Sequence, residues 1–187
     1  MKRPLCLALC GAMLCILCAC TTSVPEADAL RAPYGGGTFT GTCALRSTGG
    51  GTLDEFTLSV THVPGETAFA VTEPERHRGI TARYSEGDAA LTFDGVELVM
   101  PGGDVCPSVF SLIHGMLEHL PDAPLTAVGE TEREGRPCLA LRYDVLTDGD
   151  VLSFRLWLDR ESGLPCYGEA TADGACLCCD WTDCELS

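Results

Sequence analysis

Lysine is almost absent from this chain of 187 residues, because Lys2 is the only one. Glycines run together at positions 35–37 and 49–51, as they do in phosphate-binding loops. A Gly-rich loop of the Walker type needs a lysine after the glycines, and Schiff-base catalysis needs a lysine amine. Both chemistries are therefore excluded downstream of Lys2.

Positive charge of any kind is scarce. The sequence has 12 Lys and Arg against 27 Asp and Glu, which gives a formal charge of −15. Without Lys2 and Arg3, ten basic residues remain and the charge falls to −17. Nucleic acid is excluded as a partner, because its phosphates would be repelled rather than neutralised.

Motifs of hydrolytic catalysis and of metal binding are also missing. The chain has no Gly-x-Ser-x-Gly nucleophile elbow, and we find no convincing Ser, His and Asp set. His114 and His119 are five residues apart, so on a helix they point about 140° apart and cannot bind one ion together. His62 and His77 do not form a metal-binding spacing with another histidine. We therefore expect no enzyme, no catalytic residue, no metal and no cofactor.

The first twenty residues read as an export signal that ends in a cysteine. Lys2 and Arg3 precede an apolar run over residues 5–18, which is too short for a stop-transfer helix. The run closes with Leu17-Cys18-Ala19-Cys20, and this Leu-x-Ala-Cys pattern resembles the lipobox of bacterial lipoproteins. The resemblance implies a diacylglyceryl group on Cys20; the alternative is an ordinary signal peptide cut near Ala19 or Thr22.

The lipobox sets the expected domain boundaries. Residues 1–19 are the lipoprotein signal peptide, and residues 20–37 are a lipidated N-terminus with a flexible tether, rich in small and polar residues. Residues 38–187 form one domain that is long enough to bury a core. We expect the mature protein to be lipid-anchored on the extracytoplasmic face of the cell membrane.

Most of this domain alternates apolar and polar residues with the two-residue period of half-buried strands. Phe56, Leu58 and Val60, for example, alternate with threonine and serine. Asp94-Gly95 and Asp148-Gly149 are typical of tight hairpin turns. About nine to eleven antiparallel strands are predicted.

One segment follows the helical period instead. Between Pro107 and Leu120 the apolar residues recur at i, i+3, i+4 and i+7, which predicts an amphipathic helix that Pro121 ends. A helix this short can cover a long sheet only if the sheet curls around it. The expected fold is mainly β (α+β): a strongly curved antiparallel half-barrel with one helix across its concave face.

A family resemblance agrees with this expectation. The run from Leu156 to Pro165, LWLDRESGLP, and the closing strand that ends Asp180-Trp181-Thr182-Asp183 look like the last hairpins of the LolA/LolB/LppX-like lipoproteins. The resemblance extends over about residues 38–186 and implies a half-barrel that holds lipid or acyl chains. The chain departs from this pattern by lacking a clear helix before its first strand.

We therefore expect a non-enzymatic lipoprotein that binds a lipid or acyl chain in an apolar groove. The residues expected to line the groove are Phe39, Phe56, Leu58, Leu91, Phe93, Phe110, Ile113, Met116, Leu117, Leu141, Tyr143, Phe154 and Leu156. For each of them alone, ordinary core packing remains the alternative. A second hypothesis is a docking or regulatory lipoprotein with a cell-envelope protein partner such as a cell-wall amidase, which the resemblance to germination lipoproteins implies.

Cysteine is frequent after the signal. Eight follow Cys20: Cys43, Cys106, Cys138, Cys166, Cys176, Cys178, Cys179 and Cys184. An even number in an exported protein is compatible with disulfides. Cysteine also replaces apolar residues within the signal, which favours its use as a small hydrophobe. On a strand, Cys176, Cys178 and Cys184 would face away from Cys179, so four metal ligands would not converge.

Replacing the lipobox cysteine tests the anchor. Cys20→Ala should move the protein from the membrane fraction to the soluble fraction, because two acyl chains supply the membrane affinity and the acidic domain supplies none. Immunoblots of fractionated cells measure the shift, with Cys18→Ala as the matched control. A Cys20→Ala protein that stays on the membrane would contradict the assignment.

Overall fold

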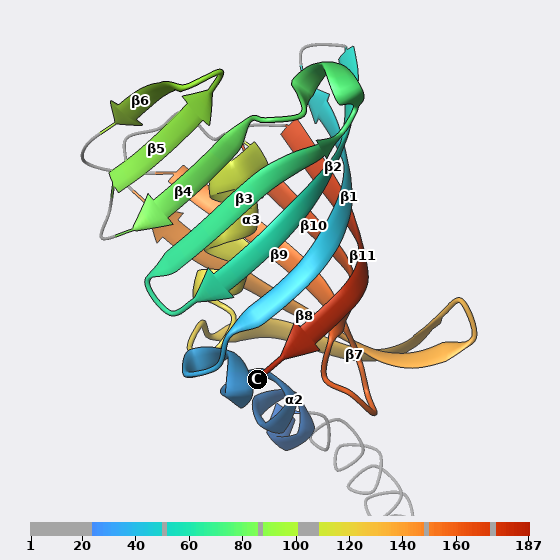
Figure 1. Cartoon of the computed structure of the whole chain (residues 1–187). Helices are drawn as coiled ribbons and strands as arrows, with labels where there is room; N and C mark the ends of the chain where they lie inside the picture. Colours follow the sequence, from blue (N-terminus) through green and yellow to red (C-terminus); the bar gives the residue numbers. More distant parts are fainter. Residues whose placement is uncertain (1–23, 50–51, 86–87, 101–108, 148–149, 173–174) are drawn as a thin grey trace, which may run out of the picture.

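The computed structural model of the chain describes residues 24–49, 52–85, 88–100, 109–147, 150–172 and 175–187 (Figure 1). The expected signal peptide, Cys20 and Cys106 lie outside these ranges. No helix within them is long and apolar enough to cross a membrane.

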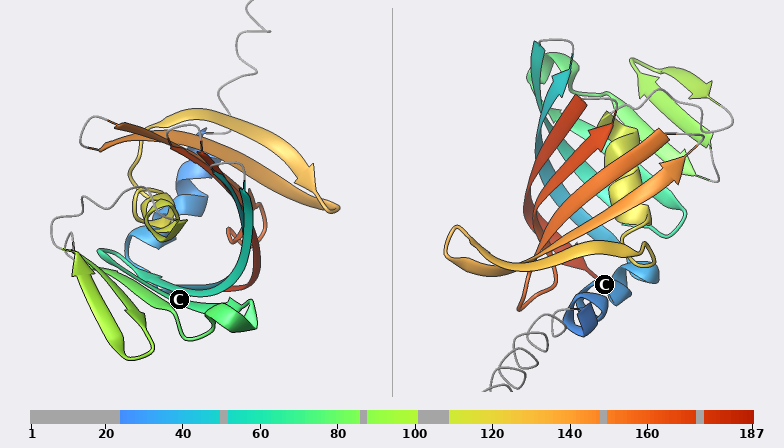
Figure 2. Two further views of the ribbon diagram at one scale, coloured as in Figure 1. Left: turned by 90° about the horizontal axis from the view of Figure 1, so that it is seen from above. Right: turned by 180° about the vertical axis from the view of Figure 1, so that it is seen from behind.

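Eleven strands of the described chain form one antiparallel sheet. They are β1 (Phe39–Gly49), β2 (Thr52–Val63), β3 (Glu66–Glu73), β4 (Thr81–Ser85), β5 (Asp88–Phe93), β6 (Val96–Met100), β7 (Leu125–Arg133), β8 (Arg136–Thr147), β9 (Asp150–Asp159), β10 (Pro165–Ala172) and β11 (Ala175–Leu186). Their order is β6-β5-β4-β3-β2-β1-β11-β10-β9-β8-β7, so β6 and β7 are the edges and the sheet stays open. Figure 2 shows it curling around helix α3. The predicted fold class is confirmed.

Alternation along the strands places the apolar side chains on the concave face. Cys43 and Leu45 of β1 are buried, and Leu58 lies opposite Cys43 on β2. The residues between them, such as Ala44, are exposed on the convex face. At the β5–β6 turn, Asp94 and Gly95 both have positive φ (50° and 77°), as the predicted two-residue hairpin requires.

Helix α3 (Val109–Glu118) fills the concave side, where the sequence predicts the helix. Its fully or almost fully buried residues are Leu112, Ile113, Met116 and Leu117. They recur at helical spacing and face the sheet from inside the curl (Figures 1 and 2). The chain leaves the helix before Pro121, which has no amide hydrogen to continue it.

The expectation of a flexible tether over residues 20–37 is wrong from Val24 onward. Helix α2 (Val24–Arg31) and the 3₁₀ helix η2 (Ala32–Gly35) precede β1, although the sequence shows no clear helix there. Ala27 is completely buried and Tyr34 is 1% exposed. A segment that inserts such side chains into the core is part of the folded domain.

Polar contacts to distant segments hold these two helices. The Tyr34 hydroxyl donates a hydrogen bond to the Gly163 carbonyl at 2.9 Å. Arg160 makes a two-point ion pair with Glu26, with distances of 2.7 and 2.9 Å. Arg31 donates to the Ala123 carbonyl at 2.6 Å. Because these partners lie about 90 to 135 residues away, local composition gave no sign of them.

One cysteine of β11, Cys184, faces the opposite side of the sheet from the side predicted. Cys176 and Cys178 are half-buried on one face while Cys179 is buried on the other, as alternation predicts. Cys184 should share the face of Cys176 but packs against the core instead. Asp183 just before it has a positive φ of 50°, and the β1–β11 register shifts between Thr40 and Thr42. Such a bulge inserts an extra residue and so reverses the facing.

The seven cysteines of the described ranges are free thiols. The Sγ atoms of Cys138 and Cys166 are 3.4 Å apart. Their strands β8 and β10 lie on either side of β9. A disulfide bond is about 2.05 Å long, so at 3.4 Å the two sulfurs are in contact but not bonded.

A second thiol pair lies on the concave face. Cys43 pairs with Trp181 in the β1–β11 register, and Cys179 pairs with Leu45. The two cysteines are thus diagonal neighbours, with Cα atoms about 7 to 8 Å apart. The hydrogen bond with the Cys179 thiol and then burial raise the pKa of Cys43, which keeps it protonated and unreactive.

Reducing agent should therefore change stability little. The melting temperature of the purified protein should shift by less than about 2 °C on adding reductant, because loss of one native disulfide would cost about 2 to 5 kcal/mol and shift it further. Alkylation of the denatured, unreduced protein should label both Cys138 and Cys166. A drop beyond about 5 °C, or an unlabelled pair, would show that a bridge forms.

Candidate functional site

The thirteen residues expected to line a groove lie at three levels of exposure. Nine are buried: Phe39, Leu58, Ile113, Met116, Leu117, Leu141, Tyr143, Phe154 and Leu156. Three are half-buried: Phe56, Leu91 and Phe110. These twelve belong to or pack against one apolar cluster that joins helix α3 to the sheet. Phe93 is 49% exposed and lies outside that cluster.

Helix α3 packs closely against β9 and β10. A Cβ added to Gly115 of the helix would lie 3.2 Å from the Phe154 ring, and one added to Gly168 of β10 would lie 2.8 Å from the Met116 sulfur. The Tyr143 hydroxyl donates a hydrogen bond to the Met116 carbonyl. Burial raises the pKa of Tyr143, so this donor stays protonated. The side chains leave little free space between helix and sheet here.

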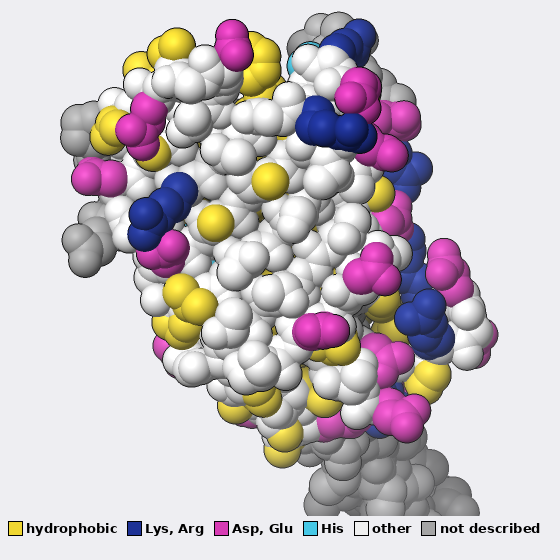
Figure 3. All heavy atoms as spheres, viewed as in Figure 1, with side chains coloured by type: hydrophobic (Ala, Val, Ile, Leu, Met, Phe, Trp, Pro, Cys, Tyr) yellow, Lys and Arg dark blue, Asp and Glu magenta, His cyan; other side chains and the backbone are white. Residues whose placement is uncertain are grey.

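Beyond the helix the concave face remains apolar but loses its cover. Leu98 lies opposite Leu91 in the β5–β6 register, and Val96 lies opposite Phe93. Leu91 is half-buried, whereas Phe93, Val96 and Leu98 are 49%, 72% and 56% exposed. We refer to these four residues as the β5–β6 corner. Figure 3 shows hydrophobic side chains gathered at this end of the molecule.

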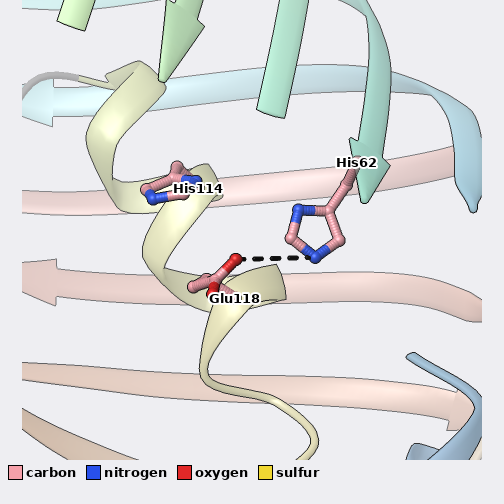
Figure 4. A group of neighbouring side chains, drawn as sticks. All are labelled: His62, His114 and Glu118. Carbon is pink, nitrogen blue, oxygen red and sulfur yellow. Dashed lines mark ion pairs between the residues drawn. The ribbon is translucent and has the colours of Figure 1, made fainter. Parts of the chain in front are cut away.

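A polar cluster connects helix α3 to the β2–β3 hairpin (Figure 4). His62 at the end of β2 is 1% exposed, and its Nε2 lies 4.0 Å from a carboxylate oxygen of Glu118. That oxygen also accepts a 2.9 Å hydrogen bond from the Gly65 amide in the hairpin turn. His114 lies one helical turn before Glu118. A ring nitrogen of each histidine and a carboxylate oxygen lie within 4.8 Å of one another.

One hydroxyl joins the two imidazoles. Thr67 Oγ1 lies 2.8 Å from Nδ1 of His62 and 2.8 Å from Nδ1 of His114, and Thr67 is completely buried. A hydroxyl donates one hydrogen bond. With neutral rings, the hydroxyl either donates to one Nδ1 and accepts from the other, or accepts from the Nδ1–H of both rings. If His62 is the ring protonated on Nε2, this proton points toward Glu118 and the chain of bonds is consistent throughout.

Burial keeps both rings neutral. Desolvation lowers the pKa of His114 to about 4 and also lowers the pKa of His62, while the Glu118 carboxylate acts in the opposite direction on both. The neighbouring His62 and His119 lower the pKa of His114 further. Tyr84 stacks on the His114 ring with centroids 5.1 Å apart. At neutral pH each imidazole therefore has an unprotonated nitrogen.

The sequence predicts no functional role for these residues. His114 and His119 are the nearest histidines along the chain, whereas the partners of His114 in space are His62, 52 positions earlier, and Glu118. The signal that could have found half of the cluster is the i, i+4 spacing of His114 and Glu118, which puts two ligand types on one helix face. The contribution of the β2–β3 hairpin depends on the curl of the sheet.

Similarity to known proteins is found in the structure of this chain and not in its sequence. No protein-family model matches the sequence, and no curated protein matches it. A DUF1329 family protein from Desulfovibrio piger shares 10% identity at a TM-score of 0.51, covering 89% of this chain and 94% of that one. A LolA superfamily protein from Nitrosomonas europaea shares 13% (TM-score 0.43; 90% and 93% covered), and the Mycobacterium tuberculosis lipoprotein LppX shares 12% (0.45; 86% and 95%).

LolA- and LppX-type proteins are thus among the solved structures that this chain resembles in fold, as the closing hairpins led us to expect. The observed order of the eleven strands around α3 agrees with the expected half-barrel. Helix α2 supplies the element before the first strand that the sequence did not reveal. At identities of 10 to 13% the likeness concerns the fold alone, so function has to be argued from the residues of this chain.

The close contact between α3 and the sheet can be tested with one methyl group. Gly168→Ala should lower the free energy of unfolding by about 1 to 3 kcal/mol, because the added Cβ would overlap the buried Met116 sulfur. Urea denaturation measures the change. Gly129→Ala on β7 is the matched control, since nothing lies within 4 Å of its added Cβ. Equal stability of the two variants would mean that the helix has room to move.

Proposed function

We propose that this protein is a non-enzymatic lipoprotein, anchored on the extracytoplasmic face of the cell membrane through Cys20, that binds an acyl chain of a lipid. The observation that carries the proposal is the β5–β6 corner. There the apolar concave face continues past helix α3 and exposes Phe93, Val96 and Leu98 to solvent. Exposed apolar surface of this kind is typical of binding sites.

The packing around helix α3 defines the path that an acyl chain could follow along the concave face. Under the helix, Met116 and Phe154 pack too closely for an added chain. From the corner, half-buried Leu91 leads inward toward the N-terminal end of α3, where Phe110 contacts Phe69 with ring centroids 5.4 Å apart. An acyl chain lying along this path would remove the corner from water at about 0.8 kcal/mol for each buried CH₂ group.

The lipid anchor at Cys20 and the β5–β6 corner would lie at opposite ends of the domain. Helix α2 lies at the opposite end of the half-barrel from β5 and β6 (Figures 1 and 2). Residues 21–23 separate Cys20 from α2 and can span at most about 14 Å. The anchored protein would hold α2 near the bilayer and present the corner away from it. Such an arrangement suits a protein that receives or delivers a lipid.

A second candidate is docking of a cell-envelope protein, and the edge strand β6 favours it. Its outer backbone groups have no neighbouring strand among the described residues, and Val99 on its convex face is 54% exposed. An extended peptide could add to such an edge as a further strand. A partner of this kind would contact both faces of β6, whereas an acyl chain would contact the concave face alone.

Two neighbouring residues of β6 separate these functions. Leu98 and Val99 are almost equally exposed, at 56% and 54%, but lie on opposite faces. Leu98→Ser should weaken binding of a fluorescent long-chain fatty acid about tenfold, because it removes roughly 1.5 kcal/mol of apolar contact. Val99→Ser should leave the affinity unchanged. Fluorescence titration of the purified protein measures both.

The outcomes that contradict the proposal are distinct. No fatty-acid binding by the wild-type protein, together with no lipid in native mass spectra, would reject lipid uptake and leave docking as the better hypothesis. Equal weakening by Leu98→Ser and Val99→Ser would place the fatty acid on the edge rather than on the concave face. Either result leaves the assignment of the fold unaffected.

A further inference from the structure

We propose that His62, His114 and Glu118 form a binding site for Zn²⁺ that fastens helix α3 to the β2–β3 hairpin. One ring nitrogen from each histidine and one carboxylate oxygen already lie within 4.8 Å of one another (Figure 4). The proposal is independent of lipid binding, because none of the three residues belongs to the β5–β6 corner. It also departs from the expectation from sequence that the chain binds no metal.

The donor set favours zinc over the common hard cations. Two imidazoles and one carboxylate match Zn²⁺ and its neighbours in the transition series, whereas Ca²⁺ and Mg²⁺ prefer oxygen ligands alone. Three protein ligands with a water in the fourth position make a tetrahedral zinc site. Bond lengths of about 2.0 to 2.2 Å put tetrahedral ligand atoms about 3.3 to 3.5 Å apart. The observed atoms need to close by roughly 1.5 Å at most.

Glu118 can supply part of that movement, because its Oε2 lies 4.0 Å from Nε2 of His62. Its side chain is 29% exposed, whereas His62 is 1% exposed and fixed in the core. The carboxylate accepts from the Gly65 amide through Oε2, so Oε1 can turn toward a metal without breaking this contact. The half-exposed carboxylate also provides a route for the ion from solvent. Its negative charge offsets part of the charge of the metal.

Thr67 has the position of an outer ligand that orients the rings. Its hydroxyl contacts Nδ1 of both histidines at 2.8 Å, which leaves Nε2 of each ring for another partner. With both rings protonated on Nδ1, the two lone pairs of one hydroxyl can accept both hydrogen bonds. Metal-binding histidines are commonly held in this way through the second nitrogen.

Titration of the purified protein with Zn²⁺ alone tests the site. Isothermal calorimetry should give one site, and a zinc concentration of about 100 times Kd should raise the melting temperature by about 5 to 10 °C. Glu118→Gln should weaken binding about 100-fold while its amide oxygen still accepts from Gly65. His119→Gln is the matched control, because it removes an imidazole directly after the end of α3 and outside the cluster, and it should bind as the wild type does.

Variants of Thr67 separate orientation from simple packing. Thr67→Val keeps the shape but removes the hydroxyl, and it should weaken zinc binding about 10- to 100-fold. Thr67→Ser keeps the hydroxyl and should restore most of the affinity. If the buried variants fail to fold, Glu118→Gln alone still decides the question, since its side chain is partly in solvent.

Co²⁺, used in place of Zn²⁺ as a spectroscopic probe, distinguishes metal binding at this site from metal binding at the cysteines. Co²⁺ bound by His62, His114 and Glu118 should show weak visible bands without a thiolate charge-transfer band in the near ultraviolet. A strong thiolate band would place the metal on the cysteines and overturn the proposal. Unchanged zinc affinity in Glu118→Gln, or no heat of binding in the wild type, would overturn it as well.

Discussion

The burial of one continuous apolar face by helix α3 is the constraint on which this structure depends. An eleven-stranded sheet that stays open has edges at β6 and β7 and a concave side that must leave water. A helix of ten residues is about 15 Å long, so it can reach this surface only where the sheet curls around it. The close approaches at Gly115 and Gly168 follow from that geometry, because bulkier residues there would push the helix away from β9 and β10.

The limited length of α3 also explains why the molecule has both a filled side and an open side. Over β8 to β10 the helix contacts the sheet directly, and Tyr143 secures it through the Met116 carbonyl. Toward β5 and β6 the same apolar face continues without a partner, which leaves Phe93 and Leu98 in solvent. On the third side, facing the β2–β3 hairpin, the contact is polar and uses His62, Thr67 and His114. Packing, a candidate ligand surface and a candidate metal site thus surround one helix.

Much of the fold could be predicted from local patterns. The two-residue alternation placed the strands correctly, the Asp94-Gly95 turn is confirmed, and the apolar spacing from Val109 to Leu120 located α3; the expected turn at Asp148-Gly149 lies outside the described residues. The N-terminal segment was misjudged, because the contacts of Tyr34 with Gly163 and of Glu26 with Arg160 join residues about 130 positions apart. The facing of Cys184 was misjudged because alternation cannot anticipate a bulge at Asp183. Of the polar cluster, the i, i+4 pair His114 and Glu118 was visible in principle and the other members were not.

The sequence by itself determined the strand periodicity, an amphipathic helix between Pro107 and Pro121, the acidic charge and the Leu-x-Ala-Cys pattern that ends at Cys20, since each is a property of neighbouring residues. The tertiary structure decided which apolar residues are covered: Met116 is completely buried, whereas Phe93, with the same local pattern, is half exposed. It also decided that His62 meets His114 and that Cys138 touches Cys166 across an intervening strand. Periodicity assigns a residue to a face, but the curl of the sheet and the length of the helix determine what that face meets.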